Sequence, residues 1–378
     1  MTLKRGQRRK PDRAPTSGSS PKVRHLERFV VREVQTKDLQ GVYELSSFLD
    51  SVNIPHDRDI LRSTIKAARD GFNGRTADPT RRIYMFVLEL LEPRTIVGTC
   101  TIYAQHGHPE TPHVFFDVID DERYSSTLDR HFSHKTLRLG FNYRGPTEIG
   151  ALVIHPEHRA FGFGRPLSFA RFLFMAMFRE RFRPKVIAEL MPPLESDGRS
   201  LLWEHLGRHF TGLGYQEADK LSHRNKEFIY ALFPQTALYA SLLPPEVHEL
   251  IGQVGPETAS VRRMLEDVGF EYRDRIDPFD GGPHFEANVD DVLQVREARR
   301  LRTSSRDLPE EVEQQVLARR VVHGAERRLI GAAAPEGPTK FRATVGAITV
   351  EGGDAVLSAS TRRLLRLKPG YDVWATAL

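Results

Sequence analysis

Residues 148–164 read Glu-Ile-Gly-Ala-Leu-Val-Ile-His-Pro-Glu-His-Arg-Ala-Phe-Gly-Phe-Gly, and this stretch indicates the fold. Residues 148–154 are an apolar run of strand length, and Pro156 cannot continue a strand ladder because it has no backbone N–H. Two glycines, Gly162 and Gly164, then precede a long apolar helix with Pro166 near its first position. A strand that diverges, a glycine turn and a helix N-terminus expose a row of N–H groups that can bind pyrophosphate. The pattern therefore predicts a cofactor-binding loop; a plain basic turn is the alternative.

The composition is that of an ordinary soluble globular protein. The chain has 378 residues, of which 39% are hydrophobic and 28% charged, enough for two or three domains. No apolar run reaches membrane-spanning length, and the N-terminus lacks the hydrophobic segment of a secretory signal. The single cysteine, Cys100, excludes an internal disulfide and a cysteine-based metal cluster, and we expect it to be a small buried side chain. We therefore expect a cytoplasmic protein that makes no membrane contact.

The net charge of +5 is concentrated at the N-terminus. Residues 1–24 carry eight Lys or Arg against one acid and few apolar residues, which predicts a disordered basic tail. The remainder of the chain is close to neutral, so we do not expect a nucleic-acid partner. Binding through the tail stays open as an alternative to a solubilising extension.

The order of strand-like and helix-like segments predicts a mixed α/β sheet. The expected strands are residues 28–34, 82–91, 95–104, 148–154, 186–191 and 227–233. The expected helices are residues 36–49, 57–69, 165–181 and 200–209. Residues 105–146, rich in His, Pro, Asp and Ser, are interpreted as an insertion.

A pattern in the second half of the chain partly repeats the first. Residues 259–268 are amphipathic and end in Gly269-Phe270, much as residues 201–210 lead into Gly212. This repetition predicts a diverged second copy of the half-domain. Beyond it, residues 302–338 are interpreted as a charged helical linker and residues 340–378 as three short strands.

The unit Pro-Glu-His-Arg-x-x-Gly-x-Gly over residues 156–164, with a strand before it and a helix after it, resembles the acyl-CoA site of the GNAT acyltransferases. A closer resemblance, over about residues 147–300, is to the arginine N-succinyltransferase family. It rests on segments that follow one another in order, among them Arg171-Phe-Leu-Phe-Met-Ala176, Val186-Ile-Ala-Glu189, Leu206-Gly-Arg-His-Phe210, Ile251-Gly-Gln-Val254 and Ile276-Asp-Pro-Phe-Asp-Gly-Gly-Pro283.

The resemblance implies a GNAT-like mixed sheet with a diverged second GNAT-like half and a small C-terminal β-rich segment. It also implies succinyl transfer from succinyl-CoA to the α-amine of arginine, with no tightly bound cofactor. The domains expected on this basis are a basic tail (1–24), an acyl-CoA-binding GNAT-like domain (25–237), a second GNAT-like half (238–300), a linker (301–338) and a β-rich segment (339–378).

The glycine turn and the resemblance together predict the acyl-CoA site. Leu152 matches the family's succinyl-CoA contact, and Glu148 matches the family's glutamate. The residues expected to bind the acyl-CoA are Leu152, Val153, Ile154, Arg159, Phe161, Gly162, Phe163, Gly164 and Arg165.

Two departures from the family pattern concern catalysis and the acceptor. Gly255 stands where the family has its proton-donating histidine, and residues 48–55 replace the family's amino-acid-binding stretch. We expect Glu148 to act as a base through water, with a structural salt bridge as the alternative. We expect His284 to compensate for Gly255, because histidine is the usual proton shuttle.

Recognition of arginine requires a carboxylate for its guanidinium group. Asp50 and Asp57 are the candidates, although each can equally cap a helix or face solvent, and Asp280 is expected to shape the pocket. His106, His108 and His113 lie near one another in the sequence. Since they have no helical i, i+4 spacing and no nearby cysteine, we expect no metal site.

The predicted function is therefore an acyl-CoA-dependent transfer of succinyl to arginine by direct attack. Two alternatives stay open. One is the same chemistry on another amine, such as ornithine; the other is a catalytically inactive CoA-binding subunit. The sequence also leaves open whether the chain forms homo- or hetero-oligomers.

Overall fold

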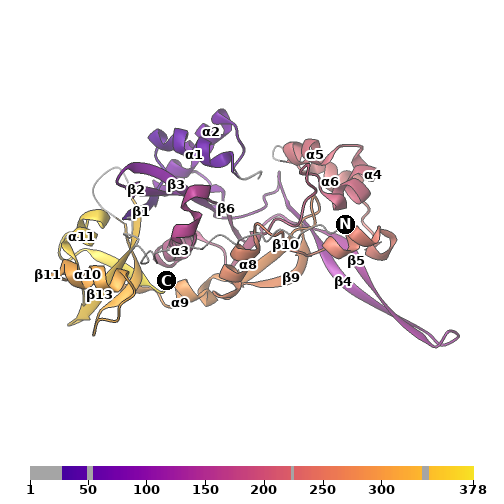
Figure 1. Ribbon diagram of the computed structural model, residues 1–378. Helices are drawn as coiled ribbons and strands as arrows, with labels where there is room; N and C mark the ends of the chain where they lie inside the picture. Colours follow the sequence, from indigo (N-terminus) through magenta and orange to yellow (C-terminus); the bar gives the residue numbers. More distant parts are fainter. Residues whose placement is uncertain (1–27, 49–53, 223–224, 334–339) are drawn as a thin grey trace, which may run out of the picture.

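The computed structural model describes residues 28–48, 54–222, 225–333 and 340–378. The predicted basic tail and Asp50 lie outside the described residues. A single fifteen-stranded mixed sheet runs through this part of the chain, with helices on its faces (Figure 1). The mixed α/β sheet predicted from the sequence is confirmed.

The first part of the sheet contains five neighbouring strands with helices on both faces. Its neighbouring strands are β1 (Phe29–Glu33), β2 (Ile83–Leu91), β3 (Arg94–Tyr103), β6 (Thr147–Ile154) and β7 (Lys185–Glu189). Helices α1 (Leu39–Ser46) and α2 (Arg58–Phe72) pack on the face that carries Met85 and Val87 of β2. Helix α3 (Gly164–Met177) packs on the opposite face, which carries Tyr84 and Phe86. Period-2 alternation along β2 thus places one helical layer on each side.

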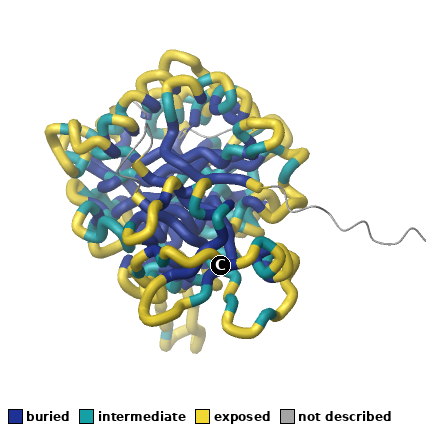
Figure 2. Tube along the Cα trace, turned by 90° about the vertical axis from the view of Figure 1, so that its left-hand side faces the viewer, coloured by how far each residue is buried: buried dark blue, intermediate teal, exposed yellow. Residues whose placement is uncertain are grey.

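Helix α3 lies at the centre of the largest cluster of buried side chains. It is apolar nearly all round because it contacts the sheet on one side and α9 and the C-terminal strands on the other. Figure 2 shows the buried residues as a continuous layer through the middle of the molecule. Cys100 is part of this core, and burial raises the pKa of its thiol to about 12, which confirms a structural role for it.

Strands β6 and β7 are parallel and diverge almost at once. They pair only at Thr147 with Val186 and at Glu148 with Ile187. Further along β6, two residues, Ala151 and Leu152, lie opposite the single residue Cys100 of β3, and Ala151 has a φ of 51°. Such a bulge bends its strand. The divergence therefore begins directly beyond Glu148 and opens toward the glycine turn.

The second part of the sheet continues from β7 through β10 (Pro283–Asn288), β9 (Glu271–Ile276), β4 (His113–Ser125), β5 (Arg130–Asn142) and β8 (Leu238–Tyr239). The expected insertion is a long β4–β5 hairpin that extends away from the body of the molecule (Figure 1). The helices of this part are α4 (Arg208–Thr211), α5 (Tyr215–Ser222), α6 (Glu227–Leu232), α7 (Pro245–Leu250) and α8 (Ala259–Glu266).

The prediction of a strand over residues 227–233 was wrong. This segment forms α6 and its C-cap residue Phe233, and Ile229 and Phe233, four residues apart, are both buried in the second core cluster. A short apolar run does not by itself distinguish a strand from a buried helical turn, and here the helical spacing decides.

The C-terminal residues form a closed five-stranded barrel. Its strands are β11 (Arg299–Asp307), β12 (Glu326–Ala332), β13 (Arg342–Glu351), β14 (Asp354–Leu357) and β15 (Asp372–Thr376). Around the ring the order is β12, β15, β11, β14 and β13, and β13 pairs again with β12. Helix α9 (Leu293–Arg296) precedes the barrel, and α10 (Glu310–Leu317) and α11 (Ala359–Leu365) lie within its chain segment.

The barrel corrects the prediction of a charged helical linker. In the described part of this range, residues 301–333, α10 is the one α-helix, and the flanking segments supply barrel strands. The charges misled the prediction because β11 points its arginines to solvent while Thr303 faces inward. The three strands expected over residues 340–378 are confirmed as β13, β14 and β15. Because the sheet is continuous from the barrel to β8, the division into domains stays a prediction.

Among the described residues, no helix combines the length and the apolar character needed to span a membrane.

Candidate active site

The glycine turn borders a groove beside the start of α3. Gly162, with a φ of 76°, ends a 3-10 turn over Pro156–Phe161 and leads into the helix at Gly164. A Cβ built on either glycine meets no atom within 4 Å, so both open onto free space. The groove has a volume of about 430 Å³, and Leu152, Arg159, Gly162, Gly164 and Arg165 line it together with residues of α8.

The groove is positively charged and lies at a helix N-terminus. Arg159, Arg165 and Arg263 line it against one acid, Asp267, which pairs with Arg165 at 2.7 Å. Arg159 Nε donates to the carbonyl oxygen of Ile154 at 3.3 Å, which holds the guanidinium beside the end of β6. Backbone N–H groups at the start of a helix and a surplus of arginine favour an anionic ligand such as a pyrophosphate.

Four of the predicted acyl-CoA residues do not line this groove. The side chains of Val153, Ile154 and Phe163 are buried in the core, and the ring of Phe163 packs against Phe29. Phe161 is exposed and stacks on Phe163 with ring centroids 5.8 Å apart. Three of these side chains pack in the core and that of Phe161 lies at the surface, so five of the nine expected residues line the groove.

A cluster of imidazoles and carboxylates occupies the point where β6 and β7 diverge. We call it the histidine cluster; it consists of His106, His113, His284, Glu148 and Glu189. Glu189 is the last residue of β7, and Glu148 is the last residue at which β6 pairs with β7. His113 begins β4, His284 lies directly opposite Glu189 on β10, and His106 lies in the loop between β3 and β4.

Glu189 is at the centre of this cluster. Its Oε1 lies 3.3 Å from Nε2 of His113, 3.4 Å from Nε2 of His284 and 3.9 Å from Nε2 of His106. The other ring nitrogen of His106, Nδ1, lies 2.5 Å from Oε2 of Glu148. The structure thus brings the two predicted catalytic residues, Glu148 and His284, into one cluster with residues that the sequence did not assign.

Burial dominates the electrostatics of the cluster. It lowers the pKa of His284 and lowers that of His113 well below the usual value. Burial also acts on His106, but the carboxylates of Glu148 and Glu189 together outweigh it and raise the pKa of that imidazole. Burial raises the pKa of Asp277, in the turn before His284, to about 7, and the charge of Glu189 adds to this effect. Shifted groups gathered at a strand opening are typical of functional sites.

The two predicted acceptor residues within the described part of the chain, Asp57 and Asp280, have structural roles. Asp57 caps α2, where its carboxylate accepts hydrogen bonds from the amides of Asp59 and Ile60. Asp280 accepts from the amide of Gly282 at 2.7 Å and shapes the turn that carries His284. Burial, followed by the charge of Asp277, raises the pKa of Asp280 well above the usual value. The altered stretch 48–55 comes close to the site at Phe48, whose ring lies edge-on to His155 at 4.8 Å.

Gly255 lies at the same strand end as the histidine cluster. Its amide donates to the carbonyl oxygen of Met191, two residues beyond Glu189, at 2.9 Å. The position that carries the family's histidine in the resemblance therefore lies beside the chain that leaves β7. Sequence reasoning missed Glu189 as a site residue although it quoted the motif that ends in it, and it set His106 and His113 aside.

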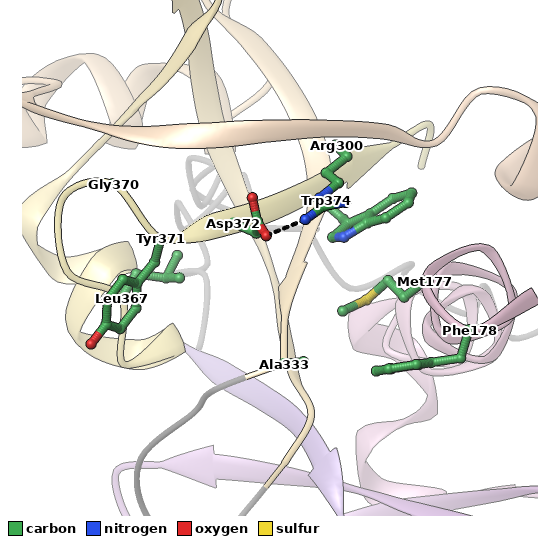
Figure 3. A pocket seen from close by; sticks show the side chains of 9 residues that line it. All are labelled: Met177, Phe178, Arg300, Ala333, Leu367, Gly370, Tyr371, Asp372 and Trp374. Atoms are coloured by element: carbon green, nitrogen blue, oxygen red, sulfur yellow. Dashed lines mark hydrogen bonds and ion pairs between the residues drawn. The ribbon is translucent and has the colours of Figure 1, made fainter.

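A second cavity, of about 480 Å³, lies between the end of α3 and the barrel. Figure 3 shows Met177 and Phe178 on one side of it and the Arg300–Asp372 ion pair and Trp374 on the other. It contains no residue of the groove or of the histidine cluster.

Comparison with known proteins gives consistent results over most of the chain. A family model described as the arginine N-succinyltransferase beta subunit matches residues 29–294. A protein named arginine N-succinyltransferase from Yersinia pseudotuberculosis is 38% identical over 271 residues, which cover 71% of this chain and 77% of that protein. One from Enterobacter sp. strain 638 is 36% identical over 274 residues, covering 72% and 79%. The solved structure of arginine/ornithine succinyltransferase subunit AI from Pseudomonas aeruginosa superposes with a TM-score of 0.76 and 26% identity, covering 93% of this chain and 99% of that one.

Proposed function

Because this chain belongs to the arginine N-succinyltransferase family, we propose that it transfers the succinyl group of succinyl-CoA to the α-amino group of arginine. The observation that carries this proposal is the adjacency of two sites. The arginine-lined groove at the start of α3 and the histidine cluster lie along the same diverging strand, β6. One holds an anionic cofactor and the other offers groups that exchange protons.

The acyl-CoA binds with its pyrophosphate at the N-terminus of α3 and its thioester in the β6–β7 opening, beside Leu152. The amine nitrogen of arginine attacks the thioester carbonyl carbon, and the carbon–sulfur bond breaks as the C–N bond is completed. The amine gives up one proton to a base, and the leaving thiolate takes up one proton. No covalent enzyme intermediate forms.

Positioning supplies most of the acceleration. Deprotonating an α-amine at neutral pH costs only about 1–2 kcal/mol, whereas holding amine and thioester together contributes on the order of 7–11 kcal/mol. A positioned proton acceptor adds about 10²–10⁴ in rate. Loss of the family's histidine at Gly255 is therefore compatible with an active enzyme.

We assign the proton acceptor to His284, which lies opposite Glu189 at the opening. For Glu148 we propose a different role from the base acting through water that the sequence predicted. Since its Oε2 lies 2.5 Å from Nδ1 of His106, it acts through that imidazole as a positioning residue rather than through water. Asp57 and Asp280 are left out of the acceptor site because their carboxylates already serve a helix cap and a turn.

The experiment that tests the function is thiol release from succinyl-CoA by the purified chain with arginine, ornithine and a panel of other amines. We expect release with arginine. Release with ornithine or another amine only would move the acceptor assignment and leave the transfer chemistry in place. CoA binding without release on any amine would contradict the proposal and favour an inactive CoA-binding subunit.

The residue assignments are tested with His284→Asn and Glu148→Gln. We expect kcat for succinyl transfer to fall about 10²–10⁴-fold in His284→Asn. In Glu148→Gln we expect a smaller fall in kcat, with an unchanged KM for succinyl-CoA. His131→Asn, a change at a half-exposed histidine of the β4–β5 hairpin, is the matched control and keeps full activity. Full activity in His284→Asn would remove that residue from the mechanism.

A further inference from the structure

Three side chains of the histidine cluster have the arrangement of metal ligands. His106, His113 and Glu189 come from the loop before β4, the first residue of β4 and the last residue of β7. Their ligand atoms all lie within 4.8 Å of one another. Nε2 of His113 lies 3.3 Å and Nε2 of His106 3.9 Å from the same carboxylate oxygen of Glu189.

These spacings fit a small ion better than they fit hydrogen bonds. Zinc–ligand bonds of about 2.0–2.2 Å in a tetrahedron place neighbouring ligand atoms about 3.3–3.6 Å apart. The His113–Glu189 pair already has this spacing, the His106–Glu189 pair is a few tenths of an ångström wider, and all three ligand atoms lie within 4.8 Å of one another. Nε2 of His106, at 3.9 Å, is too far from the Glu189 oxygen for a hydrogen bond, and Nε2 of His113, at 3.3 Å, makes no well-aligned one.

The facing nitrogens are also buried, and apart from their contacts with Glu189 they lack a hydrogen bond to any described residue. Nε2 of His106 and both ring nitrogens of His113 have no hydrogen-bond partner in the part of the chain that the structure describes, and the His113 side chain is only 3% exposed. Leaving a buried polar atom unpaired costs about 1–3 kcal/mol. Two such nitrogens aimed at one carboxylate indicate that a further electrophile belongs between them.

A second carboxylate orients one of these ligands. Oε2 of Glu148 lies 2.5 Å from Nδ1 of His106, on the side of the ring away from Glu189. A metal-bound histidine usually donates its other N–H to a carboxylate, which fixes the tautomer with the lone pair toward the metal. His106 has this arrangement, because its Nδ1 faces the Glu148 carboxylate and its Nε2 faces Glu189 and the proposed metal position.

We infer that His106, His113 and Glu189 bind one divalent transition-metal ion, and that Zn²⁺ is the ion this ligand set suits. Two imidazoles and one carboxylate favour zinc over magnesium or calcium, which prefer oxygen ligands. Three protein ligands leave a coordination position open, as in catalytic rather than structural zinc sites. A second set of possible ligands consists of Glu189, Asp277 and His284. This set is less suited to a metal ion, because the Asp277 carboxylate already accepts a hydrogen bond from the amide of Phe279.

This inference replaces the expectation that the chain has no metal site. No ligand spacing is recognisable in the sequence, because Glu189 lies far along the chain from His106 and His113. The inferred metal site does not depend on the proposed acyl transfer, and its test uses neither acyl-CoA nor arginine.

The test is Zn²⁺ binding by the untagged full chain after treatment with a chelator. We expect isothermal titration calorimetry to give one equivalent of Zn²⁺, and Co²⁺ in its place to give the visible absorption of a four- or five-coordinate site. His113→Asn and Glu189→Gln should each weaken Zn²⁺ at least about 100-fold, and Glu148→Gln about 10–100-fold. His131→Asn is the control and should bind as the wild type does.

Thermal unfolding distinguishes a loss of Zn²⁺ binding from a loss of stability, because each variant is compared with itself in the presence and absence of Zn²⁺. Saturating Zn²⁺ should raise the melting temperature of the wild type and of His131→Asn, because a ligand that binds only the folded state stabilises it. It should not raise that of His113→Asn or Glu189→Gln. The absence of one-equivalent binding in the wild type, or unchanged Zn²⁺ affinity in both ligand variants, overturns the inference.

Discussion

At the scale of single residues, the backbone around Gly255 leaves no room for the histidine that the resemblance places at this position. An ideal Cβ at this position would lie 2.7 Å from the carbonyl oxygen of Pro192 and 3.1 Å from that of Met191. The chain leaving β7 therefore occupies the space that a side chain at 255 requires. No imidazole fits there, and in the proposed mechanism the proton acceptor is instead His284, which β10 brings opposite Glu189.

Gly255→Ala should destabilise the protein even though it adds only one methyl group. The Cβ meets backbone atoms that cannot rotate away, so we expect a loss of about 1–3 kcal/mol in the free energy of unfolding, measured by urea denaturation. Gly214→Ala is the matched control, because a Cβ there meets no atom within 4 Å. Equal stability of the two variants would show that the loop yields freely. Gly255→His should not restore activity to a His284→Asn chain.

At the scale of elements, the local sequence pattern predicted the glycine turn that borders the groove. The histidine cluster could not be predicted in this way, because it depends on the pairing of strands that lie far apart in the sequence. Residues 148–164 specify a strand, a turn and a helix by their own composition, and α3 begins within one residue of the predicted start. His113 and Glu189 meet for a different reason. Strands β10 and β9 intervene between β7 and β4, and no local signal in the chain fixes that order. The same limitation explains why His106 and His113 were set aside as ligands.

Gly164→Val should separate acyl-CoA binding from stability. A branched side chain at this position projects into the groove at the start of α3 and keeps an anionic group away from the helix N–H groups. We expect KM for succinyl-CoA to rise at least about tenfold, or about 1.4 kcal/mol, with little change in melting temperature. Gly214→Val is the control. An unchanged KM would place the pyrophosphate elsewhere.

At the scale of the whole molecule, the barrel is joined to the catalytic sheet through both strands and side chains. β1 pairs with β2 on one side and with β13 of the barrel on the other. Phe341, at the entrance to β13, is fully buried between Phe86 of β2 and Phe174 of α3, with ring centroids 5.4 and 5.3 Å away. Composition alone placed a linker here, because charged barrel strands and charged helices look alike in sequence. A joint of this kind predicts that both parts unfold together.

Phe341→Ala tests that cooperativity, and the two tryptophans report on the two parts. Trp203 lies in the second core cluster and Trp374 in barrel strand β15, so Trp203→Phe and Trp374→Phe backgrounds isolate each signal. We expect Phe341→Ala to lower the free energy of unfolding by about 3–5 kcal/mol and to shift both fluorescence transitions equally. Val350→Ala, at a half-exposed position of β13, should change it by less than about 0.5 kcal/mol. A shift confined to Trp374 would mean that the barrel unfolds alone, and only then would residues 301–378 count as a separate domain.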